Sequence, residues 1–521
     1  MRRPVLHLGA LLLPVVLMVS VAVGAVLLTG PGGCPRPPRP YLPGARILAM
    51  SAVGRPDGMG AAASRLDRLG ASGVPAFCDV TIVLTHPPLR DRVRIELWLP
   101  RSTWNGRFQA TGGGALAAGE FERALVPAVR QGYAAASTDA GLPGTPKRPP
   151  VWALRHDGTI NDGLLVNFAY RSVHDMSQIA KQVIAGFYGR PAAYSYFTGC
   201  STGGRQGLIE AQRYPGDFDG ILADAPAIAW NRLTLAQFWP QVVMNEAGVH
   251  PTACEFAAFN RAAIAACDGD DGSLDGIIGR PDTCRFDPSR LVGTSVRCHG
   301  RTIRITSADA DIVRRIWDGP TTRAGERQWY GLPRGASFNW LAGTAKPLFG
   351  PRHGAPFPVA ADWIRYFLLR QPHRDVSTIG YAEFERLFDV SRARYGAVIG
   401  SDDPDLSAFR AAGGKMLTWH GLADPVIFPQ GTVGYRRRVE SAMGGAEATD
   451  QFYRVFLAPG VGHCSGGSGP APIDPLAALV DWVERGRAPD MLPAATTGTH
   501  PNISGIVCRY PQRATADRAC R

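Results

Sequence analysis

The chain has 521 residues, more than one hydrophobic core usually organises, so its length predicts at least two structural units. Hydrophobic residues make up 45% and charged residues 19% of the chain, which excludes a disordered protein. The net charge of +12 comes from arginines dispersed along the sequence, which indicates a solvated surface rather than a nucleic-acid-binding protein.

An apolar run near the N-terminus is the membrane-like stretch of the sequence. Two arginines precede the run, which covers residues 5–28, and a glycine-proline stretch at 30–33 ends it. This order is typical of an export signal, and the run is also about long enough for an uncleaved membrane anchor. We therefore expect residues 1–33 to be a signal peptide or N-terminal anchor, and the remaining chain to be secreted or extracytoplasmic.

The ten cysteines are an even number, which in an exported chain predicts five disulfides. Zinc is the competing interpretation, but the sequence has no C-x-x-C pair and no histidine at ligand spacing. Short separations favour pairing Cys267 with Cys284 and Cys508 with Cys520. The expected disulfide cysteines are Cys34, Cys78, Cys200, Cys254, Cys267, Cys284, Cys298, Cys464, Cys508 and Cys520.

The first part of the chain predicts an α/β core. Alternating polar and apolar residues predict strands at 78–84, 93–99 and 133–137. Helical spacing follows over 167–188, and a short strand at 193–197 then runs into a glycine-rich turn and another helix. A strand, a glycine-rich turn and a helix in this order are typical of an α/β protein.

The character of the sequence changes between residues 228 and 402. This stretch carries four cysteines, an acidic loop and many tryptophans, with few alternating runs. Buried strands return at 415–420 and 452–457, and an amphipathic helix follows them. The sequence therefore predicts an α/β core in two parts, residues 34–227 and 403–521, with an inserted domain, residues 228–402, between them.

Residues 199–203 read Gly-Cys-Ser-Thr-Gly and match the G-x-S-x-G pattern, after a strand and before a helix. A sharp turn at this place lifts the serine above the sheet edge, and the N-terminus of the following helix favours negative charge. Ser201 is therefore the predicted nucleophile. The alternative is a glycine-rich turn with an incidental serine.

A serine hydroxyl needs a base, and the base needs an orienting acid. In α/β-hydrolases the acid and then the base follow the serine in the chain, on loops after late strands. Asp424 follows the strand at 415–420 and His463 follows the strand at 452–457, so the predicted triad is Ser201, Asp424 and His463. The less well placed candidates are His174, His299, Asp403, Asp405 and His420.

Two members of the predicted triad have a cysteine as their sequence neighbour. Cys200 precedes Ser201, and Cys464 follows His463. Because a working triad brings the hydroxyl and the imidazole within hydrogen-bond reach, it also brings these cysteines within bridging distance. We expect a Cys200–Cys464 disulfide that fastens the base loop to the nucleophile turn; the alternative is two independent buried thiols.

A glycine run, Thr111-Gly-Gly-Gly-Ala115, follows a predicted strand at 107–110. It resembles the loop that offers a second N–H group to an oxyanion, the first coming from Thr202. Gly113 and Gly114 are the candidate donors. The alternative is a flexible turn.

An acidic loop in the predicted insertion spaces carboxylates among glycines. Hard cations such as Ca²⁺ take several oxygens from a compact loop. Asp268, Asp271 and Asp275, with the carbonyl groups of Ser273 and Ile277, are the expected ligands of one structural ion. The glutamate of an EF-hand is absent, and a solvated acidic turn is the alternative.

The sequence resembles the tannase and feruloyl esterase family of α/β-hydrolases, which also contains the esterase acting on mono(2-hydroxyethyl) terephthalate. The resemblance covers most of the chain, and the serine motif bridged to the His-Cys motif is its most distinctive part. The matching motifs are Trp104-Asn-Gly-Arg-Phe, Ser137-Thr-Asp139, Gly199 to Gly204, Ala211-Gln-Arg-Tyr-Pro, Cys267 to Ile277, Gly413-Gly-Lys, Pro459 to Cys464 and Trp482-Val-Glu.

The resemblance implies an α/β-hydrolase core with a large inserted lid domain that carries a structural Ca²⁺. It also implies an active site between lid and core for esters of aromatic acids. The departures from the family pattern are local. The run at 111–115 differs from the commoner glycine-asparagine-glycine-glycine form, and Cys254 and Cys298 lie outside the expected spacing, so their mutual pairing is an assumption.

We therefore expect an exported serine carboxylic-ester hydrolase that acts through an acyl-enzyme on feruloyl, galloyl or terephthaloyl esters, without an organic cofactor or nucleic acid. A non-catalytic secreted binding protein, and an acyltransferase or peptidase with the same triad, are the alternatives. The sequence identifies neither the ester nor the oligomeric state. Candidates for the acyl pocket, which as large apolar residues are more often core, are Trp329, Trp340, Trp363 and Phe367.

Overall fold

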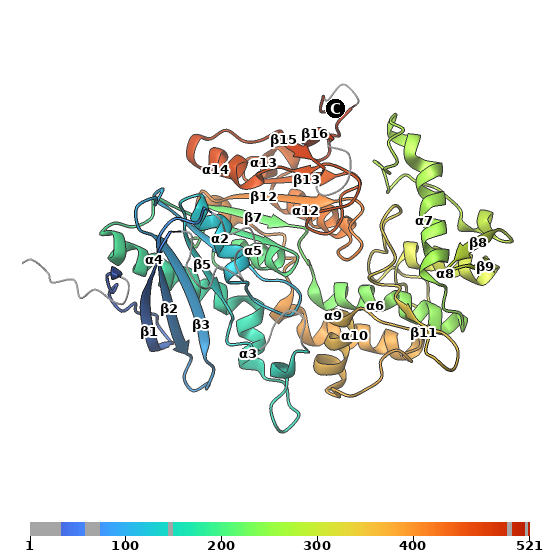
Figure 1. Ribbon diagram of the computed structural model, residues 1–521, viewed down its shortest axis with the longest axis horizontal. Helices are drawn as coiled ribbons and strands as arrows, with labels where there is room; N and C mark the ends of the chain where they lie inside the picture. Colours follow the sequence, from blue (N-terminus) through green and yellow to red (C-terminus); the bar gives the residue numbers. More distant parts are fainter. Residues whose placement is uncertain (1–32, 58–72, 144–148, 497–502, 516–518) are drawn as a thin grey trace, which may run out of the picture.

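The computed structural model describes residues 33–57, 73–143, 149–496, 503–515 and 519–521. A sheet with helices on both faces occupies the left and upper parts of Figure 1, and a largely helical body lies to its right. The predicted signal or anchor segment, apart from residue 33, lies outside the described residues. Within the described ranges, no helix combines the length and apolar character needed to cross a membrane.

A nine-stranded mixed sheet organises the core in the order β1-β2-β3-β5-β4-β6-β7-β12-β13. The strands from β1 to β5 along this order pair antiparallel, and all neighbours from β5 to β13 are parallel. The strands are β1 (Arg46–Arg55), β2 (Phe77–Thr85), β3 (Val93–Pro100), β4 (Arg107–Thr111), β5 (Ala134–Thr138), β6 (Tyr194–Cys200), β7 (Gly220–Asp224), β12 (Lys415–Gly421) and β13 (Tyr453–Ala458).

Two hydrophobic cores cover the two faces of this sheet. The consecutive residues Tyr196 and Phe197 of β6 enter different cores, as expected for side chains that alternate along a strand. Helices α2 and α14 pack on the Tyr196 side, and α4 and α5 pack on the Phe197 side. The helices of the core are α2 (Glu122–Arg130), α3 (Asp162–Val166), α4 (Ser172–Tyr188), α5 (Thr202–Arg213), α12 (Pro429–Met443), α13 (Ala446–Asp450) and α14 (Pro475–Arg485).

The chain between β7 and β12 adds no strand to the nine-stranded sheet, although β7 and β12 are neighbours in it. Most of this segment forms the right-hand body in Figure 1. The predicted insertion boundaries, 228 and 402, both fall within it. Its elements are α6 (Trp230–Ala247), α7 (Ala253–Cys267), β8 (Ser295–Cys298), β9 (Arg301–Arg304), α8 (Ser307–Asp318), β10 (Thr344–Ala345), β11 (His353–Gly354), α9 (Pro358–Asp362), α10 (Tyr381–Ile399) and α11 (Ser407–Ala411).

All ten cysteines form disulfides, which confirms the predicted use of cysteine and excludes zinc ligation by these residues. The pairs chosen for short separation are confirmed, as is the assumed pairing of Cys254 with Cys298. The five bonds are Cys34–Cys78, Cys200–Cys464, Cys254–Cys298, Cys267–Cys284 and Cys508–Cys520.

The predicted strands and helices are present, but several elements were not predicted. The strand β1 has mostly half-buried or exposed positions, so its sequence lacks a strong alternation. The strand β7 is only five residues long and fully buried. A small three-stranded sheet near the C-terminus, β14 (Ala471–Pro472), β15 (Met491–Ala495) and β16 (Ser504–Cys508), was also not predicted. The predicted helix at 167–188 begins as a π-helical turn, Asn167–Arg171, which continues into α4.

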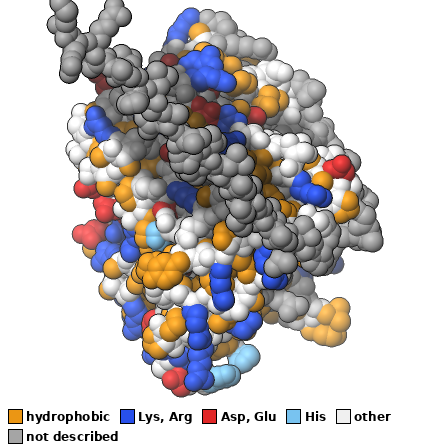
Figure 2. Space-filling view, turned by 90° about the vertical axis from the view of Figure 1, so that its left-hand side faces the viewer, with side chains coloured by type: hydrophobic (Ala, Val, Ile, Leu, Met, Phe, Trp, Pro, Cys, Tyr) orange, Lys and Arg blue, Asp and Glu red, His pale blue; other side chains and the backbone are white. Residues whose placement is uncertain are grey.

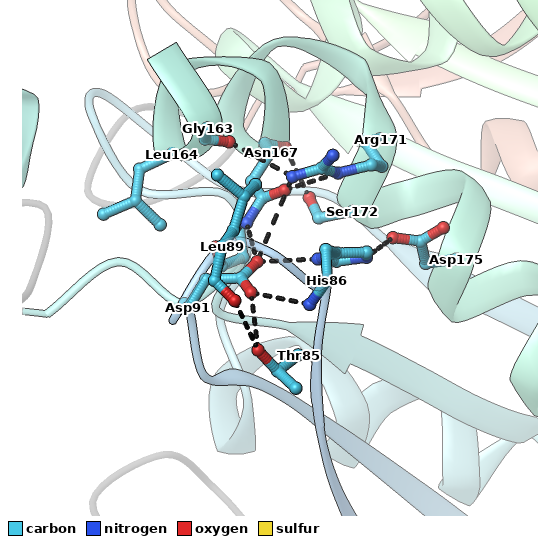
Figure 3. A network of polar contacts seen from close by, with 12 residues as sticks. Thr85, His86, Leu89, Asp91, Gly163, Leu164, Asn167, Arg171, Ser172 and Asp175 are labelled. Carbon is cyan, nitrogen blue, oxygen red and sulfur yellow. Dashed lines mark hydrogen bonds and ion pairs between the residues drawn. The ribbon is translucent and has the colours of Figure 1, made fainter. Parts of the chain in front are cut away.

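A buried ionic network joins the turn after β2 to α4 (Figure 3). The imidazole of His86 lies between two carboxylates, with Nδ1 at 2.6 Å from Asp91 Oδ2 and Nε2 at 2.9 Å from Asp175 Oδ2. Burial alone would lower the pKa of His86, but the hydrogen bonds to Asp175 and Asp91 raise it to about 9. His86 is therefore positively charged at neutral pH. Asn167 donates a further hydrogen bond to Asp91, at 2.9 Å.

Charged side chains of both signs are present on the face of the molecule that Figure 2 draws. Figure 2 shows Lys and Arg side chains interspersed with Asp, Glu and apolar groups over the face that it draws.

Candidate active site

The predicted nucleophile lies at a strained turn between β6 and α5. Ser201 has a φ of 65°, a conformation that residues with a side chain rarely adopt. Its N–H donates to the carbonyl of Asp224 at 3.0 Å, and its own carbonyl accepts from the N–H groups of Arg205 and Ala227 at 3.0 Å each. Three backbone hydrogen bonds thus hold a strained residue, a combination that clusters at active sites.

Glycines allow this turn to pack against the glycine run after β4. A Cβ atom on Gly199 would lie 2.6 Å from the backbone of Gly203, and one on Gly112 would lie 2.6 Å from Gly203 Cα. Gly203 also donates its N–H to the carbonyl of Gly113 at 2.9 Å. The Thr202 hydroxyl donates to the carbonyl of Ala115 at 2.6 Å. A larger residue at Gly112 would push the glycine run away from the nucleophile turn, and one at Gly199 would clash within that turn.

The structure brings the predicted acid and base together. Nδ1 of His463, in the loop after β13, lies 2.7 Å from Oδ2 of Asp424, in the loop after β12. The other carboxylate oxygen, Oδ1, accepts from the N–H groups of Val426 at 2.8 Å and Ile427 at 2.9 Å. Because both oxygens of the carboxylate are held, Asp424 fixes the orientation of the His463 ring and places the proton on Nδ1.

Asp424 is completely buried yet remains ionised. Burial alone would raise the pKa of Asp424, but the adjacent His463 and His420 hold this pKa well below its ordinary value. The rejected candidate His420 lies under the acid, with Nε2 at 3.2 Å from Asp424 Oδ2 and Nδ1 at 2.8 Å from the Thr432 hydroxyl. His420 is fully buried, so we interpret it as a support for the acid rather than as the base.

The predicted disulfide between the two halves of the site is present. The bond joins Cys200 to Cys464, and their Cα atoms lie 6.0 Å apart. Cys464 also has a positive φ, of 61°. The residue before Ser201 is therefore linked covalently to the residue after His463, although 264 positions separate the two cysteines in sequence.

Ser201 and His463 line one cavity of about 1420 Å³. Within the described residues, the Ser201 hydroxyl makes no hydrogen bond. Contacts of catalytic groups are often long without substrate and tighten when it binds. The cavity walls come from the glycine run after β4, from the loops after β12 and β13, and from the segment between β7 and β12.

The aromatic side chains proposed for the acyl pocket separate into two groups. Trp340 lines the cavity and is 58% exposed. Trp329, Trp363 and Phe367 are buried and do not contribute to the cavity wall. These three are core residues, as their size and apolar character favour. Two cavity residues that the sequence did not single out are Trp230 on α6 and Phe357, whose ring centroid lies 6.2 Å from that of Trp340.

The hydrogen bonds of the glycine run distinguish its two candidate oxyanion donors. The N–H of Gly113 donates to Gln206 Oε1 at 2.9 Å, so it is already used. Gln206 Nε2 donates to the carbonyl of Ala118 at 2.9 Å, which fixes the loop at a second point. The N–H of Gly114 has no hydrogen-bond partner in the described chain, and Gly114 lines the cavity. Thr202 is the first residue of α5, where backbone N–H groups have no partner within the helix.

Gln206 is a site residue that the sequence did not reveal. It lies on α5, five positions after the nucleophile, and contacts a loop from a distant part of the chain. No sequence pattern shows which loop the side chain of a helix residue contacts. The position of Gln206 on the helix that follows the nucleophile is the one signal that could have made it a candidate site residue.

The acidic loop after α7 is organised by its own carboxylates. Asp268 Oδ1 accepts from the N–H groups of Asp275, Gly276 and Ile277, and Asp271 Oδ1 accepts from the N–H of Ser273 at 2.9 Å. Burial raises the pKa of Asp275, and the nearby Asp271 and Asp268 raise it further. The donor set of carboxylates and carbonyls is the kind that Ca²⁺ prefers, and the mutual repulsion of the carboxylates favours a cation.

Other metal arrangements are not supported by the described residues. Among the described residues, one group of three His, Cys, Asp or Glu side chains has its ligand atoms within 4.8 Å of one another. It consists of Cys254, Cys298 and His299. Cys254 and Cys298 are joined in a disulfide, so they cannot ligate a metal. The three carboxylates of the acidic loop are therefore not drawn together into a preformed cluster.

The remaining candidates lie in structural interactions. His174 stacks on Tyr214, with ring centroids 3.9 Å apart, and its Nδ1 lies 2.7 Å from Asp217 Oδ2. Asp403 Oδ1 accepts from the N–H of Asp405, whose own carboxylate accepts from the N–H of Ser407. None of these residues, nor His299, lines the cavity formed by the described residues.

Comparisons with known proteins identify the relatives of this chain. The family model described as "Tannase and feruloyl esterase" matches residues 78–519. A "Probable feruloyl esterase" from Arthroderma benhamiae is 46% identical over 485 residues, covering 91% of this chain and 88% of that protein. The "Tannase" of Aspergillus oryzae is 27% identical and covers 85% of this chain and 84% of its own.

Solved structures show the same likeness. The tannin acyl hydrolase from Aspergillus niger has a TM-score of 0.84 and 26% identity, and the match covers 93% of each chain. Feruloyl esterase B from Aspergillus oryzae has a TM-score of 0.76 and 26% identity, covering 91% of this chain and 94% of that chain.

Proposed function

The chain belongs to the tannase and feruloyl esterase family of carboxylic ester hydrolases and has their α/β-hydrolase fold, and we propose that it cleaves esters of aromatic acids with a triad of Ser201, His463 and Asp424. The observation that supports this proposal most strongly is the 2.7 Å contact between Asp424 and His463 at the wall of the cavity that also contains Ser201. The Cys200–Cys464 disulfide keeps the base loop beside the nucleophile turn.

In the proposed mechanism, His463 takes the proton from the Ser201 hydroxyl through Nε2 as the oxygen attacks the ester carbonyl. Asp424 stabilises the imidazolium that forms. The N–H groups of Thr202 and Gly114 hold the oxyanion, since the N–H of Gly113 is engaged by Gln206. The alcohol leaves with a proton from His463, and a water that His463 then activates hydrolyses the acyl-enzyme.

The cavity favours a substrate with an aromatic acyl group. Trp340, Phe357, Trp230 and Leu233 give it flat and apolar walls, which suit aromatic rings. Relatives are named feruloyl esterase and tannase, so feruloyl and galloyl esters are the first candidates, with terephthaloyl esters next. We propose that the segment between β7 and β12, which provides these four residues, acts as the lid over the site.

The experiment that tests this function compares the wild type with Ser201→Ala on a panel of hydroxycinnamate, gallate and terephthalate esters. We expect hydrolysis of at least one ester by the wild type and almost none by the variant, with an unchanged circular dichroism spectrum. Wild-type turnover by Ser201→Ala contradicts the proposal. Transfer to an added alcohol in preference to water identifies an acyltransferase, and cleavage of a peptide without ester cleavage identifies a peptidase.

We also propose that the acidic loop binds one structural Ca²⁺ through Asp268, Asp271, Asp275 and the carbonyl groups of Ser273 and Ile277. Burial and then repulsion from Asp271 and Asp268 raise the pKa of Asp275; the ion would neutralise this repulsion and would take no part in the chemistry. The loop packs against the base loop: a Cβ atom on Gly460 would lie 2.7 Å from Ile277 Cγ2.

The five disulfides support the proposal that the protein works outside the cytoplasm, because such bonds persist in oxidising compartments. Export would depend on residues 1–33, as a cleaved signal or a retained anchor. Mass spectrometry of the N-terminal peptide of the exported protein distinguishes the two.

A further inference from the structure

Arg205 is a completely buried arginine in the first turn of α5, the helix that begins after the nucleophile. Its backbone N–H donates to the carbonyl of Ser201 at 3.0 Å. Among the described residues, no carboxylate oxygen lies within 4.0 Å of its guanidinium. A buried charge is normally paired, because its transfer out of water is strongly unfavourable.

The position on the helix makes this charge more unusual. The N-terminal end of a helix carries a partial positive charge, so acidic side chains are favoured in the first turn and basic ones are not. Burial lowers the pKa of Arg205 to about 9, which still leaves the guanidinium protonated at neutral pH. Arg205 thus opposes three preferences at once: it is buried, it has no acidic partner and it lies at the positive end of a helix.

Neutral groups hold the guanidinium in place. Nη1 donates to the carbonyl of Ala169 at 2.8 Å, and Nη2 donates to the carbonyl of Phe168 at 3.0 Å. Both carbonyls belong to the π-helical turn that precedes α4, and such turns are frequent at functional sites. The guanidinium carbon also lies 5.1 Å from the ring centroid of Phe168 and 5.9 Å from that of Trp230. These contacts engage Nη1 and Nη2, leave the buried Nε without a hydrogen-bond partner, and do not neutralise the charge.

Arg205 is separated from the reaction by one layer of side chains. Trp230, which it contacts, lines the cavity that contains Ser201. One helical turn plus the reach of the side chain places the guanidinium on the order of 10 Å from the Ser201 backbone. Because Arg205 is completely buried, water and salt screen its charge less than they screen a surface charge.

We propose that Arg205 is an electrostatic positioning residue that stabilises the negative charge developing on the substrate oxygen when Ser201 attacks. This inference rests on the proposed serine mechanism. Arg205 adds a full positive charge behind the partial charges of the Thr202 and Gly114 N–H groups. It does not touch the substrate, and it is preorganised, because the two carbonyls of the π-helical turn fix it before substrate binds.

A merely structural role predicts different behaviour. If Arg205 only clamps the π-helical turn, every replacement should lower stability, and activity should fall in proportion to the folded fraction. If its charge acts on the reaction, a charged replacement should preserve kcat even when stability falls. The charge should also disfavour protonation of His463, so its removal should move the acidic limb of the pH profile to higher pH.

The test compares Arg205→Lys, Arg205→Met and Arg205→Gln with the wild type, using kcat, KM, thermal stability and the pH dependence of kcat/KM. Arg213→Met is the matched control, since Arg213 lies on the same helix and also donates to a backbone carbonyl, that of Ala397 at 2.7 Å. Asp424, which contacts His463, stays unchanged in every variant.

We expect Arg205→Met and Arg205→Gln to lose about tenfold in kcat with little change in KM, the effect of a unit charge roughly 10 Å away at an effective dielectric constant of about 20. Their acidic limb should move up by as much as about one pH unit. Arg205→Lys should keep kcat within about threefold at neutral pH. Because a buried lysine loses its proton more easily than a buried arginine, the alkaline loss of activity should begin at a lower pH in this variant than in the wild type, whose Arg205 has a pKa of about 9.

Equal losses of kcat in Arg205→Lys and Arg205→Met, with an acidic limb that does not move, would overturn the proposal and leave a structural clamp. If the neutral variants do not fold, the alkaline profile of Arg205→Lys decides, and a profile identical to that of the wild type counts against the proposal. Failure of the serine mechanism is distinguishable, because it would appear first as retained activity in Ser201→Ala.

Discussion

Replacing Cys200 and Cys464 by alanine tests how the site is held together. The bond closes a loop of 264 residues, for which chain entropy alone gives up to about 5.5 kcal/mol in the free energy of unfolding. Ser201 and Cys464 both have a positive φ, a conformation that disfavours a residue with a side chain by about 1 to 2 kcal/mol. Without the bond, both residues can relax, and His463 then moves away from Ser201.

A displacement of about 1 Å in a reacting group can lower the rate about 100-fold, so we expect a loss of that order in kcat. The control is the double replacement of Cys508 and Cys520, whose bond closes a loop of 12 residues and contributes about 3 kcal/mol in the same treatment. This control should lose stability but keep kcat within about twofold, since neither cysteine lines the cavity described above.

Urea unfolding gives the stability of each double variant, and kcat is measured at a temperature at which all are folded. Unchanged kcat in the variant lacking Cys200 and Cys464 would refute the idea that the bond positions the base. An equal loss of kcat in the control would show that the effect is a general loss of stability.

Three further changes probe the rest of the molecule. The raised pKa of His86 stabilises the fold fully below pH 6.5 and no longer above about pH 9. As the pH rises between these values, the free energy of unfolding of the wild type should therefore fall by roughly 3 kcal/mol more than that of His86→Gln. Parallel pH profiles of the two proteins from urea unfolding would contradict this. A calcium chelator should lower the Tm of the wild type more than that of Asp271→Asn while leaving activity at low temperature unchanged, and a loss of activity without a Tm shift would exclude a structural ion. Trp340→Ala should raise KM for aromatic esters and change stability by no more than about 0.5 kcal/mol. Trp363→Ala should lower stability by about 3 to 5 kcal/mol. Equal effects on stability would refute the assignment of Trp340 to the cavity and Trp363 to the core.

Much of the site could be predicted from the sequence because the nucleophile, the acid and the base follow predictable strands in a fixed order along the chain. The parallel strands β6, β12 and β13 end at the same edge of the sheet, so the residues that follow them must meet. Ser201, Asp424 and His463 lie one, three and five residues after the ends of these strands. The cysteines beside Ser201 and His463 then had to be close to each other, which the structure confirms.

The parts that could not be predicted depend on contacts between distant side chains. The engagement of Gly113 by Gln206 is set by the angle at which α5 crosses the glycine run, and no local pattern reports it. Trp340 and Trp363 both belong to the segment between β7 and β12, yet one lines the cavity and the other is core. Arg205 reads as an ordinary surface arginine until its burial and lack of an acidic partner are seen.

The most direct test of the proposed mechanism is to trap the acyl-enzyme. The protein is mixed with an excess of an activated aromatic ester, quenched in acid within one turnover and digested, and the peptides are weighed by mass spectrometry. The proposed mechanism predicts the mass of the acyl group on the peptide that contains Ser201, and no modified peptide from Ser201→Ala. An acyl group on a different residue, or turnover with no covalent intermediate on a serine, would contradict it.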